Sequence, residues 1–165
     1  MKKVNTVRVK MWGTTVGYLH QEDNGLVGFQ YDDEFLKSNI EISPVTMPLA
    51  NVTYSFRSLP EQTFYGLPGM VADSLPDRFG NIVINRYLES QGREPDSLSV
   101  IERLCYTGKR GMGALEYEPS REIGAIDEPV DLDALTKLAS EILSEKENIH
   151  IEENDRFMSQ LMECS

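Results

Sequence analysis

The first third of the chain alternates apolar and polar side chains with a period of two, the pattern of strands that bury one face. In the first such segment Val7, Val9 and Met11 alternate with charged residues. Tight turns are predicted at residues 13–15 and 22–25, because glycine and asparagine adopt positive φ at little cost. The strands that these turns separate cover residues 7–11, 16–19 and 26–31. This region is therefore predicted to be an antiparallel meander.

The alternation is lost after the third predicted strand. Residues 32–38 are predicted to form one short helical turn, and residues 40–48 to continue as an extended segment at the edge of the sheet. Pro44 and Pro48 favour an edge, because proline donates no hydrogen bond to a neighbouring strand. Residues 49–63 have the composition of a loop.

Four later segments carry apolar residues at helical spacing. Ser74 and Asp77 have the spacing of a capping box at the start of the first, and Gly108 is a natural left-handed cap at the end of the second. The helices are predicted at about 75–91, 97–107, 131–145 and 152–164. The predicted fold class is α+β: a small antiparallel meander or partly closed barrel, about residues 4–48 with 114–118, packed with these helices.

Charge and hydropathy narrow the function classes. The 165 residues suffice for a core of one domain. A formal net charge of −11 opposes binding to phosphate backbones, so direct nucleic-acid binding is disfavoured. The excess acid suits a basic protein partner, with solubility as the simpler explanation. No apolar run is long enough to span a membrane, and no apolar block follows the first lysines, so a cytoplasmic protein is expected.

A basic, glycine-rich loop is predicted between the second helix and the last strand. Its free backbone N–H groups and two cations are the parts of an anion cradle, although the spacing is not that of a Walker loop. A glycine-dependent turn with solvated cations is the simpler interpretation. Contact with a phosphate or an acidic partner is the alternative. The residues of this candidate contact are Gly108, Lys109, Arg110, Gly111 and Gly113.

No residue pattern indicates catalysis or a metal site. Cys105 lies on an apolar helical stripe and is interpreted as a small core residue. His20 and His150 are far apart and near no cysteine pair, so a zinc site is not expected. Neither histidine has an identifiable orienting partner for nucleophilic catalysis. By these tests the sequence indicates a non-catalytic domain with no cofactor of its own.

Two blocks are similar to a known family. The sequences LPDRFGN at 75–81 and YTGKRGMGAL at 106–115 closely resemble the N-terminal subdomain of HipA-type protein kinases, the toxin kinases of bacterial toxin–antitoxin operons. The resemblance covers most of the chain. It implies that residues 1–120 form the N-terminal subdomain, 121–130 a linker, and 131–165 a helical lead-in to a kinase core.

The resemblance also implies an activity for the whole family. HipA-type kinases transfer the γ-phosphate of ATP, with Mg²⁺, to serine or threonine of a protein, and a DNA-binding antitoxin restrains them. Their catalytic residues follow the N-terminal region, so none is expected before Ser165 and no kinase activity is expected from this chain alone. Phe157, Leu161 and Met162 are candidates for a face that packs on a partner. Ser165 is a candidate for the family's regulatory phosphoserine.

Three functions remain open at this point. The chain is expected to be the regulatory and packing part of a HipA-like kinase, with the kinase core in the same chain. The first alternative is a stand-alone, antitoxin-like module that binds and inhibits a kinase core in a separate chain. The second alternative is an unrelated domain that binds a small anion through Lys109 and Arg110.

Overall fold

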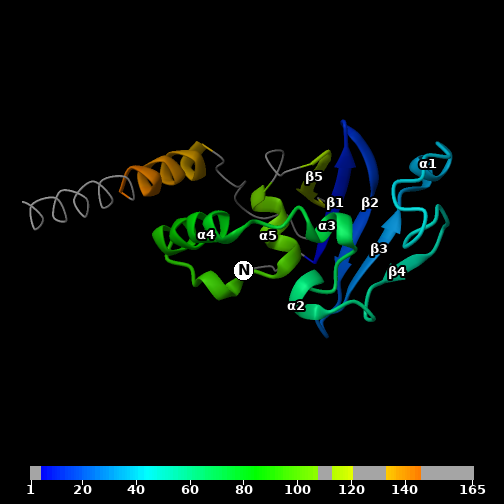
Figure 1. The fold of residues 1–165 in the computed structure, drawn as a ribbon, viewed down its shortest axis with the longest axis horizontal. Helices are drawn as coiled ribbons and strands as arrows, with labels where there is room; N and C mark the ends of the chain where they lie inside the picture. Colours follow the sequence, from blue (N-terminus) through cyan, green and yellow to red (C-terminus); the bar gives the residue numbers. More distant parts are fainter. Residues whose placement is uncertain (1–4, 108–112, 121–132, 146–165) are drawn as a thin grey trace, which may run out of the picture. The chain divides into compact units, whose positions relative to one another are not determined.

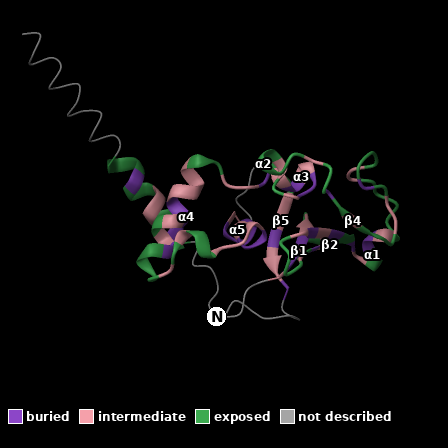
Figure 2. Ribbon diagram, turned by 90° about the horizontal axis from the view of Figure 1, so that it is seen from below, coloured by how far each residue is buried: buried purple, intermediate pink, exposed green. Residues whose placement is uncertain are grey.

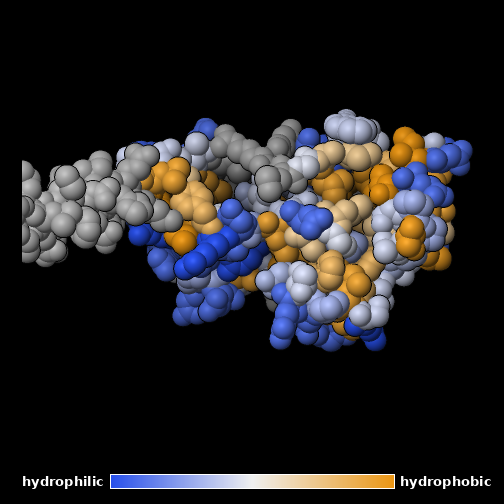
Figure 3. All heavy atoms as spheres, in the orientation of Figure 1, coloured by the Kyte–Doolittle hydropathy of each residue, from blue (hydrophilic) through white to orange (hydrophobic). Residues whose placement is uncertain are grey.

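The computed structural model describes residues 5–107, 113–120 and 133–145 (Figure 1). The chain divides into two compact units. One is Met1–Asp77 with Asp96–Val130, and the other is Arg78–Pro95 with Asp131–Ser165. The first unit contains the β-sheet and a continuous hydrophobic core. Its surface, in the view of Figure 3, mixes orange apolar atoms with blue polar ones.

Five antiparallel strands form one open sheet in the order β4-β3-β2-β1-β5 (Figure 1). The strands are β1 (Thr6–Met11), β2 (Thr14–Gln21), β3 (Val27–Tyr31), β4 (Thr53–Ser55) and β5 (Leu115–Pro119). Strands β1 to β3 are the predicted meander, and β5 pairs back onto β1 as predicted, with Tyr117 opposite Val9. Because β4 and β5 are edges, the sheet is not closed into a barrel. The α+β prediction is confirmed.

The period-two pattern places alternate side chains in the core. Val7 and Val9 of β1 are fully buried, as are Val16 and Leu19 of β2 and Phe29 of β3. Helix α5 (Val100–Thr107) contacts β5, β1 and β2 from the other side of this core. Figure 2 shows purple, buried residues on α5 and on these strands. The burial of one face of each strand is what the alternation predicts.

The segment predicted as an extended edge is an irregular loop instead. Met47 is fully buried beneath it, and its carbonyl oxygen accepts a 2.7 Å hydrogen bond from the Tyr31 hydroxyl. A turn places Met47 there, since its N–H donates to the carbonyl oxygen of Ser43 at 2.8 Å. Val45, which was expected to continue the strand, is 93% exposed. The edge strand is β4, inside the region that was predicted to be a loop.

Short helices connect the strands of the first unit. Helix α1 (Asp33–Leu36) is the predicted helical turn, and its N-cap Asp32 accepts hydrogen bonds from the backbone N–H groups of Glu34 and Phe35. The other elements of the linking segments are α2 (Glu61–Phe64), α3 (Gly69–Ala72) and the 3₁₀ turn η1 (Pro95–Ser97). Helix α2 lies within the stretch that was predicted to be a loop.

The described part of the second unit is helical. It contains α4 (Arg78–Ser90) and a helix at residues 133–145, and an ion pair of 3.2 Å joins Arg86 to Glu145. Gly92 follows α4 with a φ of +71°, the left-handed conformation in which glycine commonly ends a helix. The helix predicted at 131–145 is found over its described residues. The one predicted at 152–164 lies outside the described part of the chain.

The capping box predicted from Ser74 is wrong. Helix α4 begins at Arg78, so Ser74 lies four residues before it. The hydroxyl of Ser74 donates instead to the carbonyl oxygen of Met70 at 3.3 Å and accepts from the Tyr117 hydroxyl at 2.8 Å. A side chain held by two partners in the first unit does not cap a helix of the second.

A β-bulge in β2 brings backbone close to a neighbouring ring. Val9 pairs with Gly17 and Lys10 with Thr15, so Val16 is the extra residue. A Cβ atom on Gly17 would lie 2.7 Å from Cζ of Phe29 and still closer to a backbone oxygen. Only glycine fits this position without movement of the sheet.

Gly17→Ala is therefore expected to destabilise the fold by about 2 kcal/mol or more, because the new methyl group overlaps buried atoms that cannot move freely. Gly69→Ala is the control, since a Cβ there would meet only Cε1 of Phe64, at an ordinary 3.6 Å. Urea unfolding followed by circular dichroism measures both free energies of unfolding. Equal stabilities of the two variants would contradict the proposed close packing.

Candidate functional site

Helix α5, which leads into the basic loop, is held at its start by a capping box. The backbone N–H of Ser99 donates to the Glu102 carboxylate at 2.7 Å, and the Glu102 N–H donates to the Ser99 hydroxyl at 3.3 Å. The sequence Ser-Val-Ile-Glu carries this signal, but the helix was predicted to begin at about residue 97, three residues before Val100. Ile101, Leu104 and Cys105 are buried, as predicted.

Cys105 is a core residue. Its side chain is 5% exposed, and burial, with a smaller contribution from the negative charge of Glu102, raises the pKa of the thiol from 9.0 to about 12. The thiolate is the reactive form of cysteine, so this thiol is inert at neutral pH. The interpretation of Cys105 as a packing residue is confirmed.

A buried hydrogen bond links the two sequence blocks that resemble the HipA family. Tyr117 is the second residue after the second block and Ser74 directly precedes the first, and the Tyr117 hydroxyl donates to Ser74 at 2.8 Å. Both residues are buried. Burial raises the pKa of Tyr117 to about 12, against a smaller lowering by the bond to Ser74. The bond therefore joins a neutral phenol to a neutral hydroxyl in the core.

The basic loop runs between two anchored ends. Helix α5 ends at Thr107 and β5 begins at Leu115, and both elements pack in the core of the first unit. Gly113 is exposed with a φ of +126°, a conformation that side-chain-bearing residues rarely adopt. A glycine is thus required at this end of the loop, which agrees with the simpler interpretation of a glycine-dependent turn.

The other predicted contact residues lie outside the described part of the chain, so their roles stay predictions. They are Gly108, Lys109, Arg110 and Gly111 of the basic loop, Phe157, Leu161 and Met162 of the expected packing face, and Ser165.

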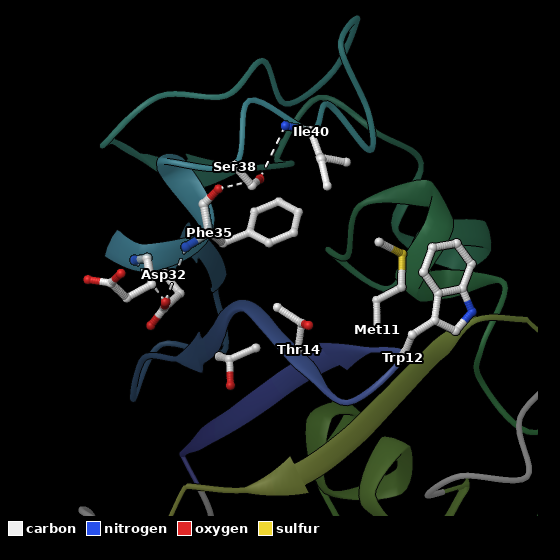
Figure 4. Close-up of a pocket in the computed structure, with 9 residues that line it drawn as sticks. Met11, Trp12, Thr14, Asp32, Phe35, Ser38 and Ile40 are labelled. Atoms are coloured by element: carbon white, nitrogen blue, oxygen red, sulfur yellow. Dashed lines mark hydrogen bonds between the residues drawn. The ribbon is translucent and has the colours of Figure 1, made fainter.

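A hollow of about 570 Å³ lies on the first unit, between the β1–β2 hairpin and helix α1 with the loop after it (Figure 4). Met11 and Trp12 line it from the hairpin, and Phe35 and Ile40 from the opposite wall. Asp32 adds a carboxylate to the α1 wall. Its volume is in the range of pockets that accept a ligand. The sequence predicted the strand that bears Met11 and the helical turn that bears Phe35, but it gave no sign that they face one another.

Within residues 5–107, 113–120 and 133–145, no group of three or more histidine, cysteine, aspartate or glutamate side chains has the arrangement of a metal site. No helix in the same ranges is long and apolar enough to cross a membrane. The described residues therefore contain a packed core, with the helix and the strand that flank the basic loop, and a surface hollow.

These features define a small α+β domain built on an open antiparallel sheet. Residues 7–118 match the HipA N-terminal domain family, and the chain belongs to that family. The match begins in β1 and ends in β5, and so includes every strand of the sheet. No curated protein sequence matches the chain.

Removing the buried hydroxyl of Tyr117 tests the bond between the two blocks. Tyr117→Phe is expected to lower the free energy of unfolding by about 1 kcal/mol, because Ser74 loses a buried hydrogen-bond partner. Tyr18→Phe is the matched control, since its hydroxyl makes only a part-buried contact of 3.5 Å with Asp32. Urea unfolding should show a clearly larger loss for Tyr117→Phe. Equal losses would mean that the buried bond contributes nothing.

Stability should also fall at high pH. Between about pH 9 and 12 the Cys105 thiol loses its proton in the unfolded chain but keeps it in the folded one, so unfolding is favoured as pH rises. Below pH 9 this contribution is fully present. Unfolding free energies measured from pH 8 to 11 should decline, and Cys105→Ala should decline less steeply. Parallel curves for the two proteins would show that the thiol is not the titrating group.

Proposed function

We propose that this domain is a non-catalytic N-terminal part of a HipA-type serine/threonine protein kinase, in which it packs on the kinase core and regulates it. The observation that carries the proposal is the family match over residues 7–118, which includes α4 of the second unit and all five strands of the first, the unit that has a hydrophobic core of its own. A domain with its own core can act as a separate regulatory body within a larger enzyme.

The chemistry of the described residues supports a non-catalytic role. Phosphoryl transfer requires a lysine and a loop on the phosphates, a catalytic aspartate and acidic ligands for Mg²⁺. The described part of the chain contains no cluster of metal-ligating side chains, and its buried cysteine is held as a neutral thiol. ATP and Mg²⁺ are accordingly proposed to bind the kinase core and not this domain.

Two partners follow from the proposal. The kinase core is the first, and the predicted contact is the apolar set Phe157, Leu161 and Met162. The DNA-binding antitoxin of the operon is the second. The net charge of −11 suits a basic protein surface better than the DNA itself. If the family's regulatory phosphoserine is carried over, Ser165 is its position.

A stand-alone module that binds and inhibits a separate kinase chain is the second candidate. The core of the first unit favours it, because a unit with its own core needs no covalent link to a kinase in order to fold. The intact mass of the gene product in its source cells separates the two candidates. A mass well above 18.7 kDa means one chain, and a mass of 18.7 kDa means a separate module.

The first candidate also predicts how the chain behaves in an assay. Purified and incubated with Mg²⁺ and labelled ATP, the 165-residue chain should incorporate no phosphate, and it should bind a HipA-type kinase core in a calorimetric titration. Replacing Phe157, Leu161 and Met162 with alanine should weaken that binding at least about tenfold, because apolar contact area is lost. The exposed Val45→Ala is the control.

Each result bears on a separate part of the proposal. Phosphate incorporation by the chain alone would overturn the non-catalytic assignment. Binding that is unchanged in the triple variant would move the contact away from the 157–162 region. No binding to any HipA-type core would remove both kinase-linked candidates.

A further inference from the structure

The tip of the β1–β2 hairpin carries the chain's single tryptophan. Met11 pairs with Thr14, so Trp12 and Gly13 form a two-residue turn, and their φ angles are +50° and +80°. A turn with positive φ at both positions favours Asn-Gly or Gly-Gly, because a bulky side chain is strained in the left-handed region. Trp12 is thus a poor residue for making this turn.

The indole is also placed where it gains little from burial. Trp12 is 80% exposed. No ring contact with another described aromatic side chain holds it. Backbone strain and an exposed aromatic ring both raise the free energy of the folded chain. Because both the positive φ and the exposed ring of Trp12 destabilise the fold, this side chain is expected to have a role other than stabilising it.

The wall opposite Trp12 is held in place before any ligand arrives. Phe35 is buried against Tyr31, with the rings stacked at 5.9 Å between centroids. The Ser38 hydroxyl donates to the carbonyl oxygen of Phe35 at 2.7 Å and accepts from the N–H of Ile40 at 3.2 Å. In Figure 4 Phe35 and Ile40 lie on one side of the hollow, and Met11 and Trp12 on the other. The apolar walls are therefore preformed.

The charge at this hollow is negative. Asp32 and Glu34 line it, and Asp33 lies between them on α1. Glu34 forms an ion pair with Lys37, whose charge also interacts with the Asp32 and Asp33 carboxylates. Among the described residues, the hydrogen bonds to the Asp32 carboxylate come from two backbone N–H groups and, at 3.5 Å, from the Tyr18 hydroxyl. A carboxylate accepts about four hydrogen bonds, so Asp32 has capacity left. Among the described residues that line the hollow there is no lysine or arginine.

We propose that this hollow binds an extended basic segment of a partner protein. An apolar side chain of the segment fills the space between Trp12 and Phe35. A neighbouring arginine or lysine reaches the Asp32 carboxylate and lies over the face of the indole. Trp is the aromatic side chain that attracts such cations most strongly. Strain and exposure at Trp12 are then explained by binding.

A peptide fits this surface better than a compact ligand. The apolar wall continues to the exterior at Ile40, which is 51% exposed, so an occupant can extend beyond the hollow. A surface with carboxylates beside exposed apolar side chains is complementary to a segment in which basic and apolar side chains alternate. The site lies on the first unit alone and does not depend on the kinase assignment.

The single tryptophan makes the test direct. A blocked pentapeptide, Arg-Leu-Arg-Leu-Arg, should shift the emission of Trp12 to shorter wavelength in a saturable titration, because the indole loses contact with water. The same peptide with glutamate in place of arginine should cause no shift. Raising the salt concentration should weaken the binding of the basic peptide.

Two variants separate binding from folding. Trp12→Asn gives the turn its favoured Asn-Gly sequence, so its melting temperature should equal or exceed that of the original chain, while calorimetry shows binding at least about tenfold weaker. Asp32→Asn keeps an N-cap but removes the charge, and should weaken binding about threefold. Glu22→Gln makes the same charge change at a remote turn and should have no effect.

Four outcomes would overturn the proposal. The first is the absence of a blue shift with the basic peptide, and the second is equal binding of the basic and acidic peptides. A marked fall in the melting temperature of Trp12→Asn would show that the indole serves the fold itself. Self-association in sedimentation that Trp12→Asn abolishes would show that a second copy of the chain occupies the hollow.

Discussion

The structure depends on the pairing of β1 with β5, two strands that are about a hundred residues apart in the sequence. Val9 and Tyr117 are opposite one another in this pair, and both are buried. Helix α5 lies on the same strands, so the pairing also fixes the ends of the basic loop. Closing so long a segment is entropically costly, and the core that covers α5 and β5 offsets that cost.

The described part of the domain combines a packed core with a hollow on its surface. Two of its buried titratable groups, Cys105 and Tyr117, are kept neutral by burial; Cys105 packs in the core and Tyr117 forms an internal hydrogen bond. The surface carries two features of another kind: the exposed Gly113 with its positive φ, and a preformed hollow with an acidic wall. The hollow is the site proposed above for the binding of a basic partner segment.

The sequence predicted those features that local pattern controls. Alternation located β1 to β3, and the apolar stripe located Cys105, because burial of one face follows from periodicity. It failed where a partner distant in sequence decided the outcome. Met47 is buried where the Tyr31 hydroxyl donates a hydrogen bond to its carbonyl oxygen. Ser74 accepts a hydrogen bond from Tyr117 and does not form the expected N-cap. The turn was expected one residue later than Trp12, because tryptophan is disfavoured at positive φ.

The distance in sequence between β1 and β5 has a consequence for synthesis. Translation adds about 5–20 residues per second, so β1 is complete on the order of 5–20 s before β5 exists. During that interval β2 pairs with one edge of β1, while the other edge has unpaired N–H and C=O groups. Val7 and Val9 are then not yet covered by α5 and β5. A nascent chain in this state is a target for chaperones and for pairing with a neighbouring chain. The unpaired edge of β1 thus carries a risk of aggregation during synthesis, which ends when β5 pairs with it.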